Sequence, residues 1–209
     1  MGLIRTAFSL ILVLLMASRV AHPSEAQDAH GGQHAFDFEL GSWHTRLSLL
    51  RNPLSGSSTW VEYEGTSEVR SIWDGRANLV ELDVSGPSGH IQGLNLRLYN
   101  PELDQWSLHF ANARTGTMTE PVVGRFSDGR GAFYGQEMID GRVVFVRFFI
   151  TEITPDSVRF EQAFSGDGGA TWETNWVAID TRVKDDSTRS RAVQGRDCSL
   201  FRPRWGRDR

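Results

Sequence analysis

The stretch FDFELGSW at residues 36–43 and the stretch SGDGGATW at residues 165–172 bracket the part of the chain that decides the fold. Between them, short runs rich in Val, Leu, Phe, Trp and Thr alternate with Gly, Asp, Asn and Pro. This texture is typical of β-strands joined by tight turns. No stretch in this part shows a sustained helical period. An all-β domain is therefore expected.

Ten strands are predicted, joined in sequence order. They lie at residues 43–51, 58–72, 77–85, 91–99, 105–113, 122–126, 132–139, 142–151, 157–164 and 172–182. Turn-forming pairs such as Asp128-Gly129 and Asp140-Gly141 stand where runs stop, so neighbours should pair as antiparallel hairpins. A meander of this length removes its exposed edges by closing. We expect an antiparallel up-and-down β-barrel of about ten strands, with a two-layer sandwich as the alternative.

The start of the chain reads as a secretory signal peptide at residues 1–26. Arg5 is followed by an apolar run at 8–17 and a small-x-small cleavage site at 24–26,. The run is too short to span a bilayer, so we expect export to the periplasm or the medium and no transmembrane segment after signal removal. A retained anchor is the alternative. The further divisions are a flexible segment at 27–35, the β-barrel domain at 36–183 and a disordered Arg-rich tail at 184–209.

Composition limits the partners. Cys198 is the only cysteine, so no intrachain disulfide can form,. The tail carries eight basic and four acidic residues, whereas 12 basic and 21 acidic residues remain on the barrel part once tail and signal are set aside. An acidic body argues against nucleic acid as a partner. The basic tail could fold back on this body or contact anionic lipid; a solvated tail without function is the alternative.

Alternation along the strands sorts residues by face but does not decide which face points inward. Arg147 is the single charge within the apolar run 143–150, and such a charge needs a partner, for which Glu161 or Glu137 on neighbouring strands could serve,. We interpret Arg147 as an anchor for an acidic ligand head group; an internal Arg–Glu pair or a solvent-facing Arg is the alternative. The candidate ligand-binding residues are Arg97, Tyr99, His109, Tyr134, Arg147 and Glu161.

The segment Ser165-x-Asp167-x-Gly169-x-Thr171-Trp172 fits the Asp-box pattern of sialidase-like propellers. It occurs once, whereas a propeller repeats its motif blade by blade. The structural interpretation is a β-hairpin in which the Asp carboxylate accepts from turn amides and the Trp packs beneath. A role in sugar binding is the alternative.

Gly41-x-Trp43 opens the first strand and Arg182 ends the last, which resembles the way calycin barrels (lipocalins and their relatives) close one end with an Arg over a Trp. Together with the segments 99–101 and 165–172, these residues look like a bacterial family of calycin-like proteins of unknown function. The resemblance implies the fold and carries no activity. It gives the barrel-closing residues Trp43, Arg182, Asp167 and Trp172 structural roles.

Catalytic and cofactor motifs are weak. The sequence has no Gly-x-Ser-x-Gly, phosphate-binding loop or His-Glu-x-x-His motif,, so no catalytic residue is assigned. His and carboxylate spacings do not fit a structural zinc site, and no metal site is assigned. The chain is also similar to ten-stranded nitrobindin barrels, which bind haem through one His, and His109 is the candidate ligand. The cofactor stays open.

We expect an exported barrel that binds a small apolar or amphipathic ligand, with an acidic ligand as one option. The alternatives are a hydrolase or isomerase acting inside the barrel and a haem-binding barrel. The apolar strand at 144–150 could also form the seam of a homodimer.

Overall fold

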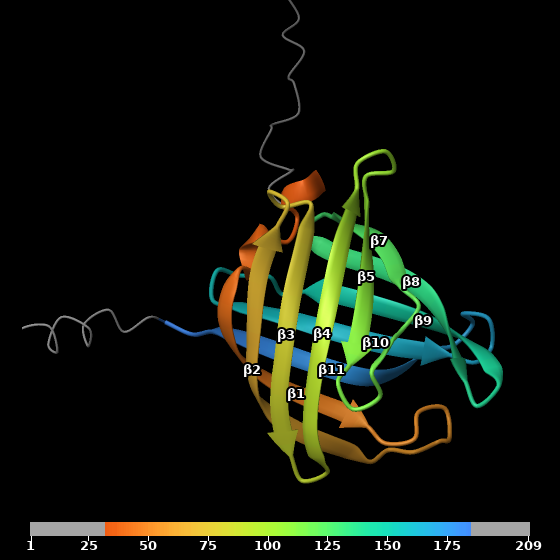
Figure 1. Cartoon of the computed structure of the whole chain (residues 1–209). Helices are drawn as coiled ribbons and strands as arrows, with labels where there is room; N and C mark the ends of the chain where they lie inside the picture. Colours follow the sequence, from red (N-terminus) through yellow and green to blue (C-terminus); the bar gives the residue numbers. More distant parts are fainter. Residues whose placement is uncertain (1–31, 185–209) are drawn as a thin grey trace, which may run out of the picture.

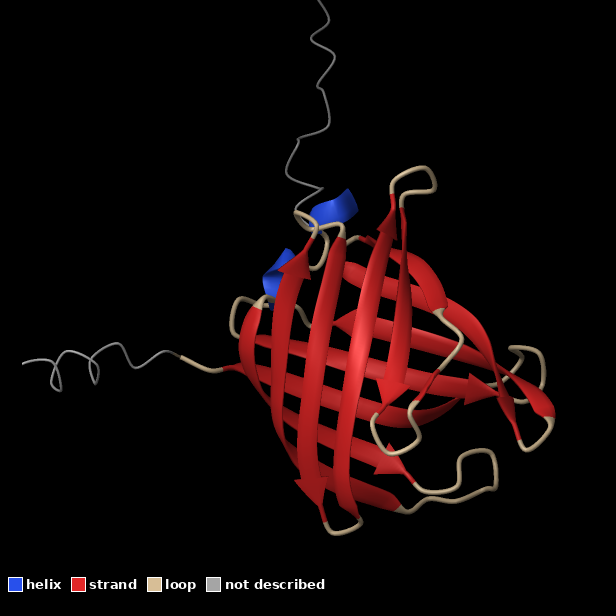
Figure 2. Cartoon of the chain, in the orientation of Figure 1, coloured by secondary structure: helices blue, strands red, loops and turns tan. Residues whose placement is uncertain are grey.

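The structure is a computed structural model, and it describes residues 32–184. The signal peptide, the tail beyond residue 184 and Cys198 lie outside the described residues. Strands make up most of the described chain (Figures 1 and 2). In order, the elements are the 3-10 helices η2 (Gly32–His34) and η3 (Asp37–Glu39), then β1 (Gly41–Leu50), β2 (Trp60–Ile72), β3 (Ala77–Gly86), β4 (Gly89–Asn100), β5 (Gln105–Asn112), β6 (Thr117–Met118), β7 (Val122–Ser127), β8 (Arg130–Ile139), β9 (Arg142–Thr151), β10 (Ser157–Ser165) and β11 (Glu173–Arg182).

The described strands form one antiparallel sheet that closes on itself. Its order is β4-β3-β2-β1-β11-β10-β9-β8-β7-β5-β6, and β4 also pairs with β5. The wall therefore contains ten strands, with the two-residue strand β6 added beside the end of β5. The expected antiparallel barrel is confirmed, and the two-layer sandwich is not formed. The sequence does not predict β6, because two residues are too few to show alternation.

Two hairpins show why the Asp-Gly pairs mark turns. Asp128 and Gly129 have φ values of 52° and 73°, and Asp140 and Gly141 have φ values of 50° and 75°. A two-residue turn of this type requires positive φ at both central positions, which Asp tolerates and Gly adopts without strain. These turns fix the registers between β7 and β8 and between β8 and β9.

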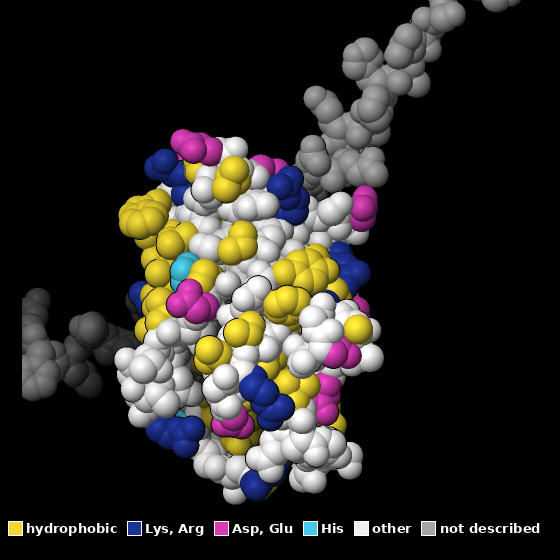
Figure 3. Space-filling model, turned by 90° about the vertical axis from the view of Figure 1, so that its right-hand side faces the viewer, with side chains coloured by type: hydrophobic (Ala, Val, Ile, Leu, Met, Phe, Trp, Pro, Cys, Tyr) yellow, Lys and Arg dark blue, Asp and Glu magenta, His cyan; other side chains and the backbone are white. Residues whose placement is uncertain are grey.

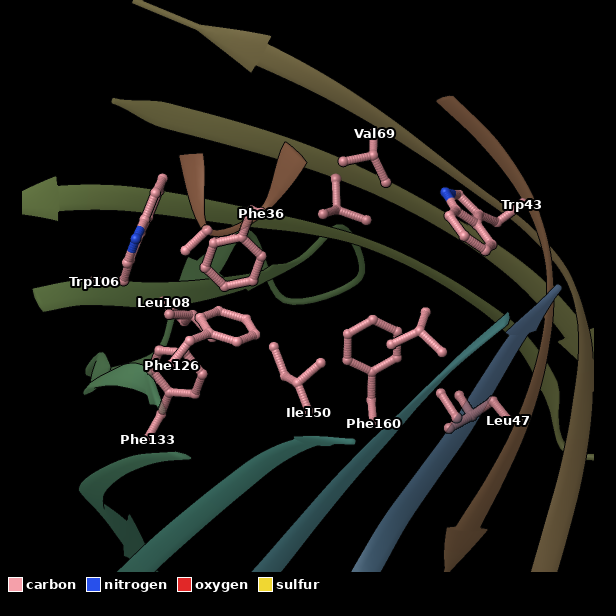
Figure 4. Close-up of a cluster of buried hydrophobic side chains, with 14 of the residues drawn as sticks. Phe36, Trp43, Leu47, Val69, Trp106, Leu108, Phe126, Phe133, Ile150 and Phe160 are labelled. Carbon is pink, nitrogen blue, oxygen red and sulfur yellow. The ribbon is translucent and has the colours of Figure 1, made fainter. Parts of the chain in front are cut away.

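The segment before β1 plugs one end of the barrel (upper end in Figure 1). The Phe36 side chain is 1% exposed, and its ring centroid lies 4.8 Å from that of Trp106 and 5.0 Å from that of Phe126, both edge to face. Figure 4 shows this aromatic group at one side of the core and Trp43 and Leu47 at the other. The core therefore joins the plug to the inner wall of the barrel.

Residues 32–35 differ from the flexible segment expected at 27–35. Gly32 is in η2, and its carbonyl oxygen accepts a hydrogen bond from Trp106 Nε1 at 3.0 Å. Ala35 is 1% exposed. These residues are ordered because they complete the plug, a tertiary contact that local composition does not reveal.

Arg182 ties the last strand to the plug. Its guanidinium carbon lies 4.1 Å from the Trp43 ring centroid. Its nitrogens donate to the carbonyl oxygens of Leu40 at 2.8 Å, Phe38 at 2.6 Å and Pro155 at 2.7 Å. This is the Arg-over-Trp contact that the calycin resemblance implies, and it makes this end of the barrel the closed one.

Candidate functional site

Below the plug, the barrel contains a cavity of about 270 Å³. This volume is close to the lower end of the range of small-molecule sites. Its apolar wall is formed by Val80, Leu82, Leu108, Phe110, Val122, Phe148, Phe160, Trp176 and Ala178. The buried polar end is formed by Glu39, Thr45, Ser67, Asn95, Arg97 and Asp180, and the remaining lining residues are Thr119, Glu120, Glu137 and Gln162. Thr119 and Glu120 are exposed, so the cavity reaches solvent there.

The cavity settles which strand faces point inward. Asn95 and Arg97 of β4 line it, so the odd-numbered face of that strand is internal. Leu108 and Phe110 of β5 line it as well, which places the alternate residues of β5 outside,. Both faces carry apolar residues, and for this reason the sequence leaves the choice open.

The polar end is built around a buried ion pair between Glu39 and Arg97. Their side chains are 1% and 4% exposed. Arg97 Nη2 donates to Glu39 Oε1 at 3.1 Å and Arg97 Nη1 donates to Glu39 Oε2, a bidentate arrangement,. The Arg97 guanidinium also lies 4.3 Å from the Phe36 ring centroid. Glu39 therefore neutralises the one basic residue of the cavity lining.

Asp180 of β11 is the second buried acid at this end, with 3% of the residue exposed. It lies opposite Thr45 in the β1–β11 ladder. Desolvation raises the pKa of Asp180 to about 7, and the negative charge of Glu39 adds to the rise; the hydrogen bond with Thr45 and the charge of Arg97 lower the pKa by less,. The cavity therefore contains a carboxyl group that changes charge near neutral pH.

Three buried polar atoms at this end have no hydrogen-bond partner among the described residues. They are Asp180 Oδ1, Asn95 Oδ1 and Arg97 Nε. Buried polar atoms in folded proteins are almost always paired. Three unpaired atoms at one end of one cavity therefore indicate a place where a polar group of another molecule can bind.

A further carboxyl group lies between the polar end and the mouth. Glu137 of β8 is half-buried, and desolvation raises its pKa. Glu120 stands at the exposed side. The route into the cavity is therefore lined by acids rather than by bases.

Among the predicted ligand-binding residues, Arg97 lines the cavity. Tyr99 also points inward, but its ring packs against Trp106 at 5.4 Å between centroids, and its hydroxyl donates to Asp104 Oδ1 at 2.9 Å. Tyr99 therefore belongs to the plugged end. A ligand contact by Tyr99 stays a prediction.

His109 and Tyr134 lie on the outward faces of β5 and β8. His109 Nε2 is 3.1 Å from Ser107 Oγ, and Tyr134 is 52% exposed. An axial haem ligand inside the barrel must point inward, and His109 does not line the cavity. The placement of His109 therefore gives no support to the haem-binding alternative.

Arg147 and Glu161 also lie outside the cavity, which corrects the idea of Arg147 as an internal anchor. The Arg147 guanidinium carbon lies 4.6 Å from the ring centroids of both Phe149 and Trp172. Glu161 pairs with Arg159, whose Nη2 donates at 3.0 Å. Arg147 can sit in an apolar run because aromatic faces and its own stem cover it on the outer surface.

The predicted dimer seam fares differently. Val144, Val146 and Ile150 are 3%, 1% and 0% exposed and point into the barrel. Figure 3 shows hydrophobic side chains interspersed with acidic and basic ones on the face turned to the right in Figure 1. Homodimer formation stays a prediction, and these three side chains do not supply its surface.

The Asp-box segment forms the hairpin between β10 and β11. Asp167 Oδ1 accepts from the Thr171 backbone N–H at 2.9 Å and from Ser165 Oγ at 2.7 Å, while Thr171 Oγ1 donates to Oδ2 at 2.6 Å. The hydrogen bonds from Thr171 hold the pKa of Asp167 at about 2. Trp172 Nε1 donates to the Gly169 carbonyl oxygen at 3.1 Å. The carboxylate is therefore used within the turn.

The sequence analysis missed Glu39 and Asp180 as site residues. Glu39 belongs to the FDFELGSW stretch, whose other residues form the plug and the first strand. Asp180 shares the inward face of β11 with Trp176 and Ala178, and this alternation was a usable signal for a buried acid.

Comparisons with known proteins were made for the whole chain. No family model matches it, and no curated protein sequence matches it. The S-type phycobiliprotein lyase CPES from Guillardia theta is 15% identical, with a TM-score of 0.49 over 71% of this chain and 90% of the lyase. The structure of EF1p2_mFAP2b bound to DFHBI is 9% identical, with a TM-score of 0.40 over 72% of this chain and 98% of that chain. A fluorescence-activating β-barrel of de novo design is 13% identical, with a TM-score of 0.39 over 71% of this chain and 97% of that chain. Likeness this distant carries no argument about function, and the bacterial family resemblance stays a prediction.

Two searches of residues 32–184 complete the description. They contain no group of three or more His, Cys, Asp or Glu side chains placed to hold a metal ion. None of the helices in this range has the length and apolar character needed to cross a membrane.

Proposed function

We propose that the protein is an exported binding protein that holds one small amphipathic molecule inside the barrel. The observation that carries the proposal is the cavity, in which an apolar aromatic wall ends in a cluster of buried polar atoms without partners among the described residues. Apolar walls with a few convergent polar groups are the usual form of small-molecule sites. Export rests on residues 1–26 alone,.

The test is saturable binding of Nile red, an uncharged lipophilic dye, measured by fluorescence. Ala178 lines the cavity, so Ala178→Phe should fill part of it and weaken the binding about tenfold or more, since buried apolar contact is lost,. Ala111, on the outward face of β5, provides the matched control Ala111→Phe. Equal dye affinity in both variants would place the dye outside the cavity and count against the proposal.

An acid–base reaction in the same cavity is the second candidate, because Asp180 has a pKa near 7 and faces bound molecules,. The residues named for catalysis from the sequence, His109 and Glu161, lie outside the cavity. The test is incubation with pooled amphipathic metabolites followed by mass spectrometry. Consumption of a compound by the wild type and not by Asp180→Asn supports the reaction; equal profiles remove it.

A further inference from the structure

This inference rests on the proposed function and deepens it. We propose that the ligand is a cationic amphiphile, a protonated amine on an apolar body, and that its ammonium group binds the carboxylate of Asp180 at the buried end of the cavity.

The charges of the lining support a cation. Four carboxyl groups, those of Glu39, Glu120, Glu137 and Asp180, face one guanidinium, that of Arg97. The bidentate contact with Glu39 already neutralises Arg97. Asp180 is therefore left as a buried acid without a cation of its own among the lining residues, and a buried carboxylate is costly unless it is paired.

The unpaired atoms fit an ammonium group. Asp180 Oδ1 and Asn95 Oδ1 are acceptors without partners in the part of the chain that the structure describes. An ammonium offers three donors and no acceptor, so it can serve both oxygens. The third unpaired atom, Arg97 Nε, is a donor. A hydroxyl or carbonyl oxygen next to the amine would accept from it, which points to an amine with an adjacent oxygen.

The wall fits the body of such a molecule. Two aromatic pairs lie along it: Phe110 with Trp176, 6.0 Å between centroids, and Phe148 with Phe160, 6.2 Å between centroids. Aromatic and aliphatic surface can bury a chain or a ring, and aromatic faces also attract cations. The volume of about 270 Å³ limits the ligand to a small molecule.

An anionic head group does not fit the same place. It would bring a negative charge beside Asp180 and Glu39, and Arg97 has no charge left to offset it,. Arg147, the anchor expected from the sequence, lies on the outer surface. The acidic ligand suggested by the sequence therefore lacks its partner.

Binding of the amine should depend on pH through Asp180. The charged groups facing Asp180 are Glu39 from η3 and Arg97 from β4. Its neighbours on the flanking strands, Thr45 and Val158, carry no charge. The carboxylate form prevails above the Asp180 pKa of about 7, while an alkylamine stays protonated to about pH 10. Affinity for the amine should therefore rise from pH 6 to pH 8.

The experiment displaces Nile red from the mature protein with decylamine, decanol and decanoic acid, three probes that share a chain and differ in charge. We expect decylamine at pH 8 to displace the dye at about tenfold lower concentration than decanol, the gain expected for a charge-assisted hydrogen bond. Decanoic acid should be the weakest. In Asp180→Asn the advantage of the amine over decanol should vanish, while displacement by decanol is unchanged.

Asp156→Asn is the matched control, because it removes the same charge from an exposed position, where Asp156 pairs with Lys184 at 3.5 Å. It should keep the preference for the amine. Decanol or decanoic acid displacing the dye as well as the amine does would overturn the inference and leave the proposed function intact. So would a preference that survives in Asp180→Asn. Failure of the dye and of all three probes to bind would overturn both proposals.

Discussion

Replacing Asp180 by Asn should stabilise the protein at neutral and alkaline pH and leave it almost unchanged in acid. Asn resembles the protonated carboxyl group in shape and cannot ionise. In the folded protein the Asp180 pKa is raised from 3.8 to about 7. A carboxyl group with a raised pKa favours the folded state below its unfolded pKa, and this contribution is lost as the pH rises through the folded pKa.

The size of the effect follows from the shift. Each pKa unit corresponds to about 1.36 kcal/mol, so a shift of roughly three units amounts to about 4 kcal/mol,. The stability difference between Asp180→Asn and the wild type should be near zero at about pH 3.5, grow between about pH 4 and pH 7, and stay constant above about pH 8.

Urea unfolding followed by tryptophan fluorescence measures this difference at each pH, and the chain contains seven tryptophans. The exposed Asp156→Asn serves as the control, and its difference from the wild type should vary by less than about 1 kcal/mol over the range. A difference for Asp180→Asn that does not change with pH, or one that turns against the variant at pH 8, would show that Asp180 is not a buried acid of this kind.

Three further substitutions test the fold and the outer surface. Phe36→Ala should lower the free energy of unfolding by about 3–5 kcal/mol, because it removes the centre of the plug,; a loss below about 1 kcal/mol in urea unfolding would show that the plug is dispensable. Gly124→Ala should cost about 2 kcal/mol or more, since a Cβ there would lie 1.9 Å from the Ala132 carbonyl oxygen,, and a thermal melt unchanged from the wild type would contradict this contact. Arg147→Ala should lose about 1 kcal/mol of stability with its contact to Trp172 and keep the Nile red affinity,; weakened dye binding would move the ligand to the outer face.

The sequence predicts the fold well because the responsible signals are local. Asp128-Gly129 and Asp140-Gly141 satisfy the backbone requirement of tight hairpins wherever they occur,. Alternating strands joined by such turns have few topologies open to them, and closure removes the free edges. No long-range information is needed for that step.

The site is harder to predict because it depends on which face turns inward and on what the plug brings with it. Residues 142–150 are apolar on both faces, so the run itself does not say that Arg147 points outward. Glu39 reaches Arg97 across 58 positions of sequence. Asp180 could be placed only by tracing β11 from Trp176 and Ala178.

A crystal structure of the protein with decylamine would be the most direct measurement. The alkyl chain should lie between Phe148 and Phe160 inside the barrel, with the nitrogen about 2.7–3.2 Å from Asp180 Oδ1,. A chain bound on the outer surface beside Trp172, or a nitrogen directed to the mouth near Glu120, would mean that the buried polar end does not recognise the ligand.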